Sequence, residues 1–186
     1  MEDVKVYHSI WKYSFLILVF FAFSIGLFWT LDYRSGYNWI LWLGILFSAG
    51  GGVIFLYMIF IERILHQPFF TITDNGIIMN TIKKYEIEFS NVKDFSLSEI
   101  KAGGFYHIYF KHRFISIHYK KNIERKKYNK ASRFGRTIRD FNKFVSGAQE
   151  AIPVDGLTIK PQQLCDLLNE RLNYYNECQE KQSALP

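Results

Sequence analysis

The sequence predicts an α+β membrane protein, in which a two-helix transmembrane hairpin precedes an antiparallel β barrel or sandwich that a C-terminal helix caps. Three observations predict this fold class. Two apolar stretches without a charged side chain occupy residues 13–31 and 39–61. From residue 68 onward, apolar side chains recur at every second position. After Pro161 they recur with helical spacing.

The two apolar stretches have the length of membrane spans. At 1.5 Å per helical residue they reach roughly 28 and 34 Å, against a hydrocarbon core of about 30 Å. Lipid offers the backbone no hydrogen-bond partners, so each stretch is expected to be a helix. The four tryptophans mark the ends of these stretches, as in an interfacial aromatic belt: Trp11, Trp29, Trp39 and Trp42.

The basic residues near the spans predict the orientation. Lys5 and Lys12 precede the first span and Arg63 follows the second, whereas the connecting loop offers only Arg34. By the positive-inside rule, both termini and the domain after Arg63 are expected in the cytoplasm. The two cysteines lack the spacing of a zinc or redox motif, which fits a reducing compartment.

Small residues recur at intervals of four within the spans, which allows helix backbones to approach closely in lipid. Two interpretations remain open: the small residues pack the hairpin on itself, or they form the contact of a homo-oligomer. The candidate packing residues are Ala22, Gly26, Gly44, Ser48 and Gly52.

Outside the spans, residues 1–12 are expected to be a short lead-in that forms an interfacial turn of helix. The domain is expected over residues 68–178, with a basic insertion at 121–150 and a polar tail at 179–186. Asp74-Asn75-Gly76 is a hairpin turn signal, and Lys111-His112-Arg113 is taken as a second turn. The predicted strands are 69–73, 77–82, 85–89, 95–100, 105–110 and 114–119, with a seventh near 152–159.

The last element is predicted to be an amphipathic helix that begins at Pro161, a residue favoured in a first helical turn. Its apolar stripe comprises Leu164, Leu167, Leu168, Leu172 and Tyr175.

An antiparallel meander closed by one amphipathic helix resembles the pleckstrin-homology (PH) superfold. The stretches that carry the resemblance are FFTITDNGI at 69–77, YEIEFSNVKDF at 85–95 and LTIKPQQLCDLLNERL at 157–172. With its two N-terminal spans, the chain resembles the bacterial membrane-anchored PH-like proteins, which implies a bacterial inner-membrane location and a seven-stranded, partly open barrel. The first turn, residues 73–76, holds no base, so inositol-lipid recognition at that turn is not expected.

The sequence contains no phosphate-binding glycine loop, no nucleophile elbow and no zinc-protease motif. We therefore expect no enzyme activity, no cofactor and no catalytic residues. His107 and His118 are expected to be cross-strand neighbours on the outward face, but two histidines without a third ligand do not indicate a metal site.

Positive charge is the strongest functional signal. Residues 111–143 contain 12 Lys or Arg and 2 Asp or Glu, a net charge of +10, while the whole chain carries +6. Residues 122–133 are expected to be an exposed loop, and Ser132 is expected to cap a helix that runs to about residue 146.

In this helix an apolar stripe and a basic stripe share the surface, which is typical of segments that bind anionic lipid headgroups. The alternative is that the apolar stripe packs on the barrel and the bases are only solvated. The candidate residues for the membrane surface or a partner are Lys126, Lys127, Arg133, Arg136, Arg139, Lys143, Phe134, Ile138 and Phe141.

The leading hypothesis is a non-enzymatic, membrane-anchored interaction module whose domain docks a protein partner or the anionic membrane surface. The alternative is an immunity-type inner-membrane protein that neutralises a bacterial toxin, which size and topology suggest. Nucleic acid is a less favoured partner for the basic patch, because the chain is anchored in a membrane.

Overall fold

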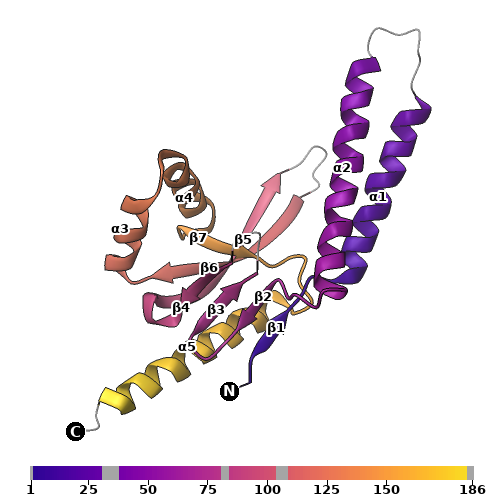
Figure 1. Ribbon diagram of the computed structural model, residues 1–186. Coiled ribbons are helices and arrows are strands. Elements are labelled where there is room, and N and C mark those ends of the chain that lie inside the picture. Colours follow the sequence, from indigo (N-terminus) through magenta and orange to yellow (C-terminus); the bar gives the residue numbers. More distant parts are fainter. Residues whose placement is uncertain (1, 31–37, 81–83, 104–108, 184–186) are drawn as a thin grey trace. The chain divides into compact units, whose positions relative to one another are not determined.

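The computed structural model describes residues 2–30, 38–80, 84–103 and 109–183 of the 186. The chain forms two compact units: Tyr7–Pro68 is a helical hairpin, and Met1–Val6 together with Phe69–Pro186 make a sheet domain (Figure 1). Each unit is considered by itself.

The hairpin consists of α1 (Ile10–Trp29) and α2 (Asn38–Arg63). Both helices are long and apolar enough to cross a membrane, and only 11% of each apolar window is buried in protein. Such exposure distinguishes them from the core helices of a soluble protein, whose apolar residues are mostly covered. The hairpin is therefore suited to a lipid environment.

Small residues of α2 lie at the contact between the two helices. A Cβ on Gly44 would lie 2.9 Å from Leu27. Farther along the hairpin, the hydroxyls of Ser24 and Ser48 share a 2.6 Å hydrogen bond. The candidates on α1 lie outside this contact, because Ala22 is exposed and a Cβ on Gly26 would meet nothing within 4 Å.

Polar contacts join the residues just before α1 to the last turn of α2. His8 donates its backbone N–H to Glu62 at 2.8 Å, and its Nδ1 contacts the other carboxylate oxygen of Glu62. Arg63 donates to the backbone carbonyl of His8 at 3.0 Å. Both His8 and Glu62 are buried, so the carboxylate is shielded from water and held by partners.

The first sheet of the domain has four antiparallel strands in the order β1 (Val4–Val6), β2 (Phe70–Ile72), β3 (Gly76–Met79) and β4 (Tyr85–Glu88). The lead-in was expected to form a turn of helix; residues 10–12 do belong to α1, but residues 4–6 form a strand. Its two valines pair with β2, and Val6 is fully buried. The burial of alternate side chains favours a strand here.

The turn between β2 and β3 forms where the sequence placed it. A Cβ on Gly76 would lie 2.3 Å from the carbonyl oxygen of Ile87, so only glycine fits beside β4.

The second sheet has three antiparallel strands in the order β5 (Val92–Gly103), β6 (Tyr109–Tyr119) and β7 (Glu150–Pro153). The turn expected at residues 111–113 does not form, because β6 continues through it and Lys111 pairs with Lys101. The pairing of β5 with β6 extends to Gly103 and Tyr109, and His107 lies outside the described residues.

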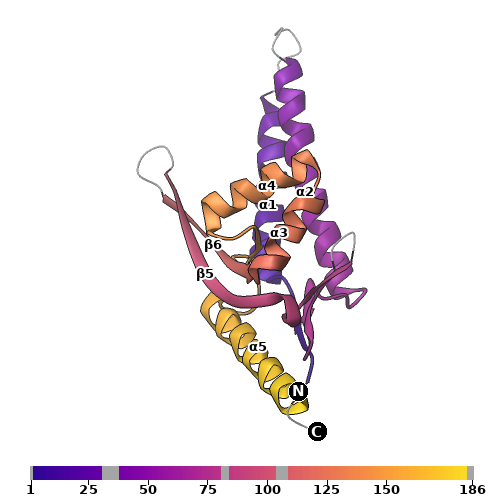
Figure 2. The ribbon, with the colours of Figure 1, turned by 90° about the vertical axis from the view of Figure 1, so that its left-hand side faces the viewer.

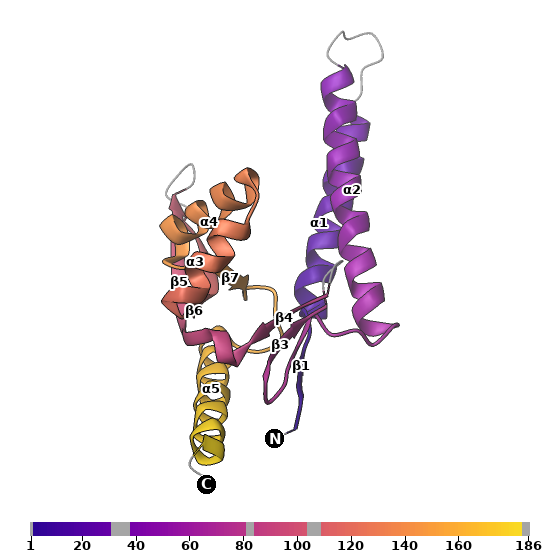
Figure 3. The ribbon, with the colours of Figure 1, turned by 60° about the vertical axis from the view of Figure 1, so that its left-hand side comes forward.

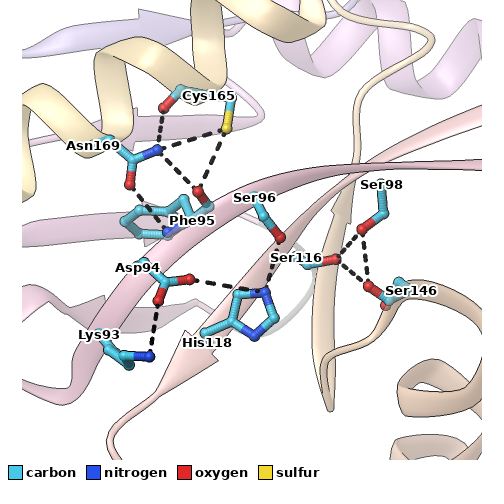
Figure 4. Close-up of polar contacts among 10 residues, drawn as sticks. All are labelled: Lys93, Asp94, Phe95, Ser96, Ser98, Ser116, His118, Ser146, Cys165 and Asn169. Carbon is cyan, nitrogen blue, oxygen red and sulfur yellow. Dashed lines mark hydrogen bonds and ion pairs between the residues drawn. The ribbon is translucent and has the colours of Figure 1, made fainter.

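The strands form two sheets and no closed barrel among the described residues. A 3-10 turn, η1 (Phe89–Asn91), separates β4 from β5. The edge of β5 is covered by a side chain instead of a strand: Asn169 accepts from the N–H of Phe95 at 3.1 Å and donates to its carbonyl at 2.9 Å (Figure 4). This amide satisfies the backbone groups that a neighbouring strand would have paired.

Asn169 belongs to α5 (Pro161–Ser183), which begins at the predicted proline. Leu164, Leu168 and Leu172 are buried in one core with residues of both sheets. Arg171 adds a 2.8 Å bond to Asp74 in the β2–β3 turn. The helix thus unites the two sheets through the apolar stripe that the sequence predicted.

Two helices, α3 (Lys121–Lys130) and α4 (Arg133–Ser146), connect β6 to β7 (Figures 2 and 3). The expected loop at 122–133 is therefore mostly helix, and the partly buried Ile123 packs against the core. The cap of α4 is confirmed: Ser132 Oγ accepts from the N–H of Gly135 at 3.1 Å. Gly147 ends the helix with a φ of 79°.

Candidate functional site

Helix α4 exposes its apolar face. The exposed fractions are 76% for Phe134, 64% for Phe141 and 90% for Phe144, with 43% for Ile138. These four residues form the apolar stripe of α4. The sequence interpretation missed Phe144, although it lies one turn beyond Phe141 and borders the same face. A helix of a soluble domain normally buries this stripe, so its exposure calls for a partner.

The polar face of α4 points inward, onto the three-stranded sheet. Its last residue, Ser146, is buried, and its carbonyl accepts hydrogen bonds from Ser98 at 2.9 Å and Ser116 at 2.7 Å (Figure 4). In β6, Ser116 alternates with the buried side chains Ile115 and Ile117, and Ser98 of β5 contacts its hydroxyl at 2.8 Å. Side chains alternate across a strand, so α4 covers the sheet face opposite the core.

One carboxylate contacts side chains of three other elements. Glu150 of β7 accepts hydrogen bonds from the Tyr119 hydroxyl of β6 and from Lys127 of α3 at 3.0 Å, and it pairs with Arg139 of α4 at 2.7 Å. Lys127 also lies 3.7 Å from the centre of the Tyr119 ring. These contacts are the Glu150 hub.

Electrostatics in the Glu150 hub favour the ionised carboxylate. Burial alone would raise the pKa of Glu150, but the Tyr119 hydrogen bond and the charges of Lys127 and Arg139 outweigh burial and hold the pKa below its ordinary value. Burial and the adjacent carboxylate raise the pKa of Tyr119, which keeps its hydroxyl a donor. The hub is a charged clamp that fixes α3 and α4 to the sheet.

Two of the other predicted cations hold α3 and α4 together. Lys143 pairs with Glu124 at 3.2 Å. Arg136 donates to the carbonyls of Asn129 and Ala131, and its guanidinium lies 5.8 Å from the Tyr128 ring centre. With Lys127 and Arg139 in the hub, these four bases already have partners within the domain.

A second group of cations is exposed and makes no ion pair among the described residues. It includes Lys126 and Arg133, both predicted candidates. On the helical wheel, Arg133 borders the apolar stripe next to Phe144. The full group is Lys120, Lys121, Arg125, Lys126, Lys130 and Arg133.

An open cleft of about 460 Å³ lies between α3 and α4. Its lining includes Lys121 and Arg125, but also Glu124 and Asp140. Asp140 accepts from the Tyr128 hydroxyl at 3.0 Å. Charges of both signs line the cleft, so it does not select a ligand of one charge. The distinguishing feature of the surface is the apolar stripe with its neighbouring cations.

Ser96, His118 and Asp94 bring the residue types of a catalytic triad together on β5 and β6 (Figure 4). Ser96 Oγ lies 2.8 Å from His118 Nε2, and Asp94 Oδ1 lies 3.8 Å from the same nitrogen. In a relay the acid orients the opposite ring nitrogen, Nδ1. The arrangement is therefore a polar cross-strand contact and does not activate the serine.

Within the described ranges, no group of three or more His, Cys, Asp or Glu side chains is placed to hold a metal ion. Comparisons with protein-family models, curated proteins and solved structures give no match to this chain.

Proposed function

We propose that this protein is a non-enzymatic, membrane-anchored interaction module whose docking surface is the apolar stripe of α4 together with its neighbouring cations. One observation carries the proposal. Helix α4 is bound to its own domain by its polar face and presents Phe134, Phe141 and Phe144 outward. The hub and the Ser146 contacts hold it in that orientation.

The size of the stripe supports a docking role. At about 200 Å² for a phenylalanine, the exposed fractions correspond to an apolar area on the order of 500 Å². That is the size of the largest patch on a typical monomer, which is often functional. Isolated exposed apolar residues are common, but four on one helix face are not.

We place the hairpin across the membrane and the sheet domain in the cytoplasm of a bacterial cell, with a PH-like domain fold. The length and apolarity of α1 and α2 support the hairpin placement. The positions of Lys5, Lys12 and Arg63 support the orientation. The immunity role stays a prediction of the sequence.

Site-specific photo-crosslinking tests the docking surface. A benzophenone amino acid replaces Phe144 in the full-length protein, and the membranes of expressing cells are irradiated. We expect crosslinks to lipid or protein, which disappear when Phe134 and Phe141 are changed to Ser. The matched control carries the probe at Asn176, an exposed polar position on α5. Equal crosslinking at the two positions would contradict the proposal.

A further inference from the structure

On the basis of the proposed function, we infer that the occupant of the docking surface is an anionic lipid bilayer, into which the apolar stripe of α4 inserts while flanking bases contact headgroups. A purely electrostatic contact would need only charge. Here the most exposed side chain of the stripe, Phe144, is 90% accessible. Amphipathic helices that lie in a bilayer interface bury such a face among the acyl chains.

Charge complementarity favours an anionic surface. Residues 120–147 hold ten Lys or Arg and two Asp or Glu. Both acids are already engaged within the domain, Glu124 by Lys143 and Asp140 by Tyr128. The exposed, unpaired cations are therefore available to anionic headgroups.

Three of the predicted bases of α4 are not assigned to the headgroups. Arg136, Arg139 and Lys143 satisfy contacts inside the domain. Lys130 and Arg133 are exposed, and they flank the start of α4 next to Phe134. These two residues are assigned the headgroup contacts.

Chain connectivity keeps the domain near the bilayer. Three residues separate β1 from α1, and six separate α2 from β2. Six extended residues span about 20 Å at most. A domain of this size has a radius of gyration of about 13 Å, so its surfaces stay within tens of ångströms of the bilayer that holds the hairpin. At such effective concentrations even weak attraction is sufficient for docking.

The test uses the full-length protein in nanodiscs that contain lipid and no other membrane protein. An environment-sensitive fluorophore is attached at Thr137→Cys in a Cys178→Ser background. Thr137 is exposed and shares the face of Phe134 and Phe141. Cys165 is buried, and burial raises the pKa of its thiol, so it does not compete for the label.

In nanodiscs with phosphatidylglycerol we expect a blue-shifted emission that nitroxide-labelled acyl chains quench. With phosphatidylcholine alone, emission should be that of a label in water. A label at Asn176→Cys on α5 should report water in both lipids.

Two sets of variants separate insertion from charge. Changing Phe134, Phe141 and Phe144 to Ser should abolish the shift, while Tyr174→Ser, an exposed aromatic of α5, should not. Changing Lys130 and Arg133 to Gln should lower the ratio of docked to undocked protein roughly 30-fold, at about 1 kcal/mol for each base. The matched control changes Lys160 and Lys181, two exposed bases elsewhere in the domain.

Each outcome decides the inference. Two results together would overturn the lipid assignment: in phosphatidylglycerol nanodiscs the label emits as it does in water, and in cell membranes the probe at Phe144 forms crosslinks. The surface would then be assigned to a protein, and the proposed function would stand. Equal shifts in both lipids, or no effect of the Gln variants, would overturn the role of anionic headgroups. The Gln changes are on the surface and leave the fold intact, so the Gln variant still tests the role of the headgroups even if the Ser variant misfolds.

Discussion

The Glu150 hub makes a sharp prediction about how the docking surface is held. Glu150→Gln keeps the size of the side chain but removes the charge that Lys127 and Arg139 share. The paired side chains are only 20–32% exposed, so water replaces the lost interaction poorly. Removing one partner of a buried pair costs about 3 kcal/mol at the low end of measured values, because the other charges remain without compensation.

In a domain of this size, a loss of about 3 kcal/mol corresponds to a fall of roughly 12 °C in the unfolding midpoint. A fluorogenic thiol dye measures it in the full-length protein, because buried Cys165 is labelled only when the sheet domain opens. Cys178→Ser serves as the background. Hydrogen exchange should rise in α3 and α4, since the hub ties α3 to β6 and β7 and shares the attachment of α4 with the Ser146 contacts.

Glu99→Gln is the matched control. Its carboxylate pairs with Lys111 at 3.4 Å, and the side chains are 38% and 62% exposed. An ion pair in water contributes little, so the change should stay within about 0.5 kcal/mol. If Glu150→Gln melts at the same temperature as Glu99→Gln, the hub does not anchor α3 and α4.

Four further outcomes are expected. The pKa of Glu150 is lowered in the folded protein. The difference in stability between the parent and Glu150→Gln should therefore be present above the ordinary value of 4.5 and shrink as pH falls through the lowered pKa. Thermal unfolding midpoints measured across pH will test this. In Leu168→Asp the thiol dye should react with Cys165 without heating, because a charge at a fully buried position costs several kcal/mol, comparable to the stability of the whole domain. Melting like that of the parent would contradict the packing of α5. Ser132→Ala should cost about 1 kcal/mol and speed hydrogen exchange in the first turn of α4, whereas Ser132→Asp should keep the cap. A reporter enzyme active only in the periplasm, fused after residue 186, should be silent if both termini are cytoplasmic.

The sequence alone predicted the elements whose causes are local. The two long apolar helices follow from uninterrupted apolar length, the β2–β3 turn from Asp74-Asn75-Gly76, and the start of α5 from Pro161. The prediction of a helix cap at Ser132 was correct for the same reason, since the hydrogen bond of this cap reaches only three residues along the chain. Such features need no knowledge of what lies across the fold.

The errors in the sequence interpretation concern pairing between distant residues. Three residues are too few for their hydrophobic pattern to indicate the strand β1. Val4 and Val6 form an edge strand only because they pair with β2, more than sixty residues later in the chain. The polar run Lys111-His112-Arg113 was interpreted as a turn, but in β6 it pairs with residues 99–101 of β5. The expected barrel does not close among the described residues, where the Asn169 side chain of α5, and not a strand, pairs with the backbone of Phe95 at the edge of β5.

For the docking surface, the sequence determined its composition and the tertiary structure decided its orientation. The periodicity of α4 places Phe134, Ile138 and Phe141 on one face and the bases on another. The helix forms equally well whichever face it turns toward the domain. The choice depends on Glu150 of β7, which pairs with Arg139, and on Ser98 and Ser116 of β5 and β6, which donate to the carbonyl of Ser146. Because buried polar groups must find partners, these three residues bind the polar face of α4 and leave its apolar face exposed.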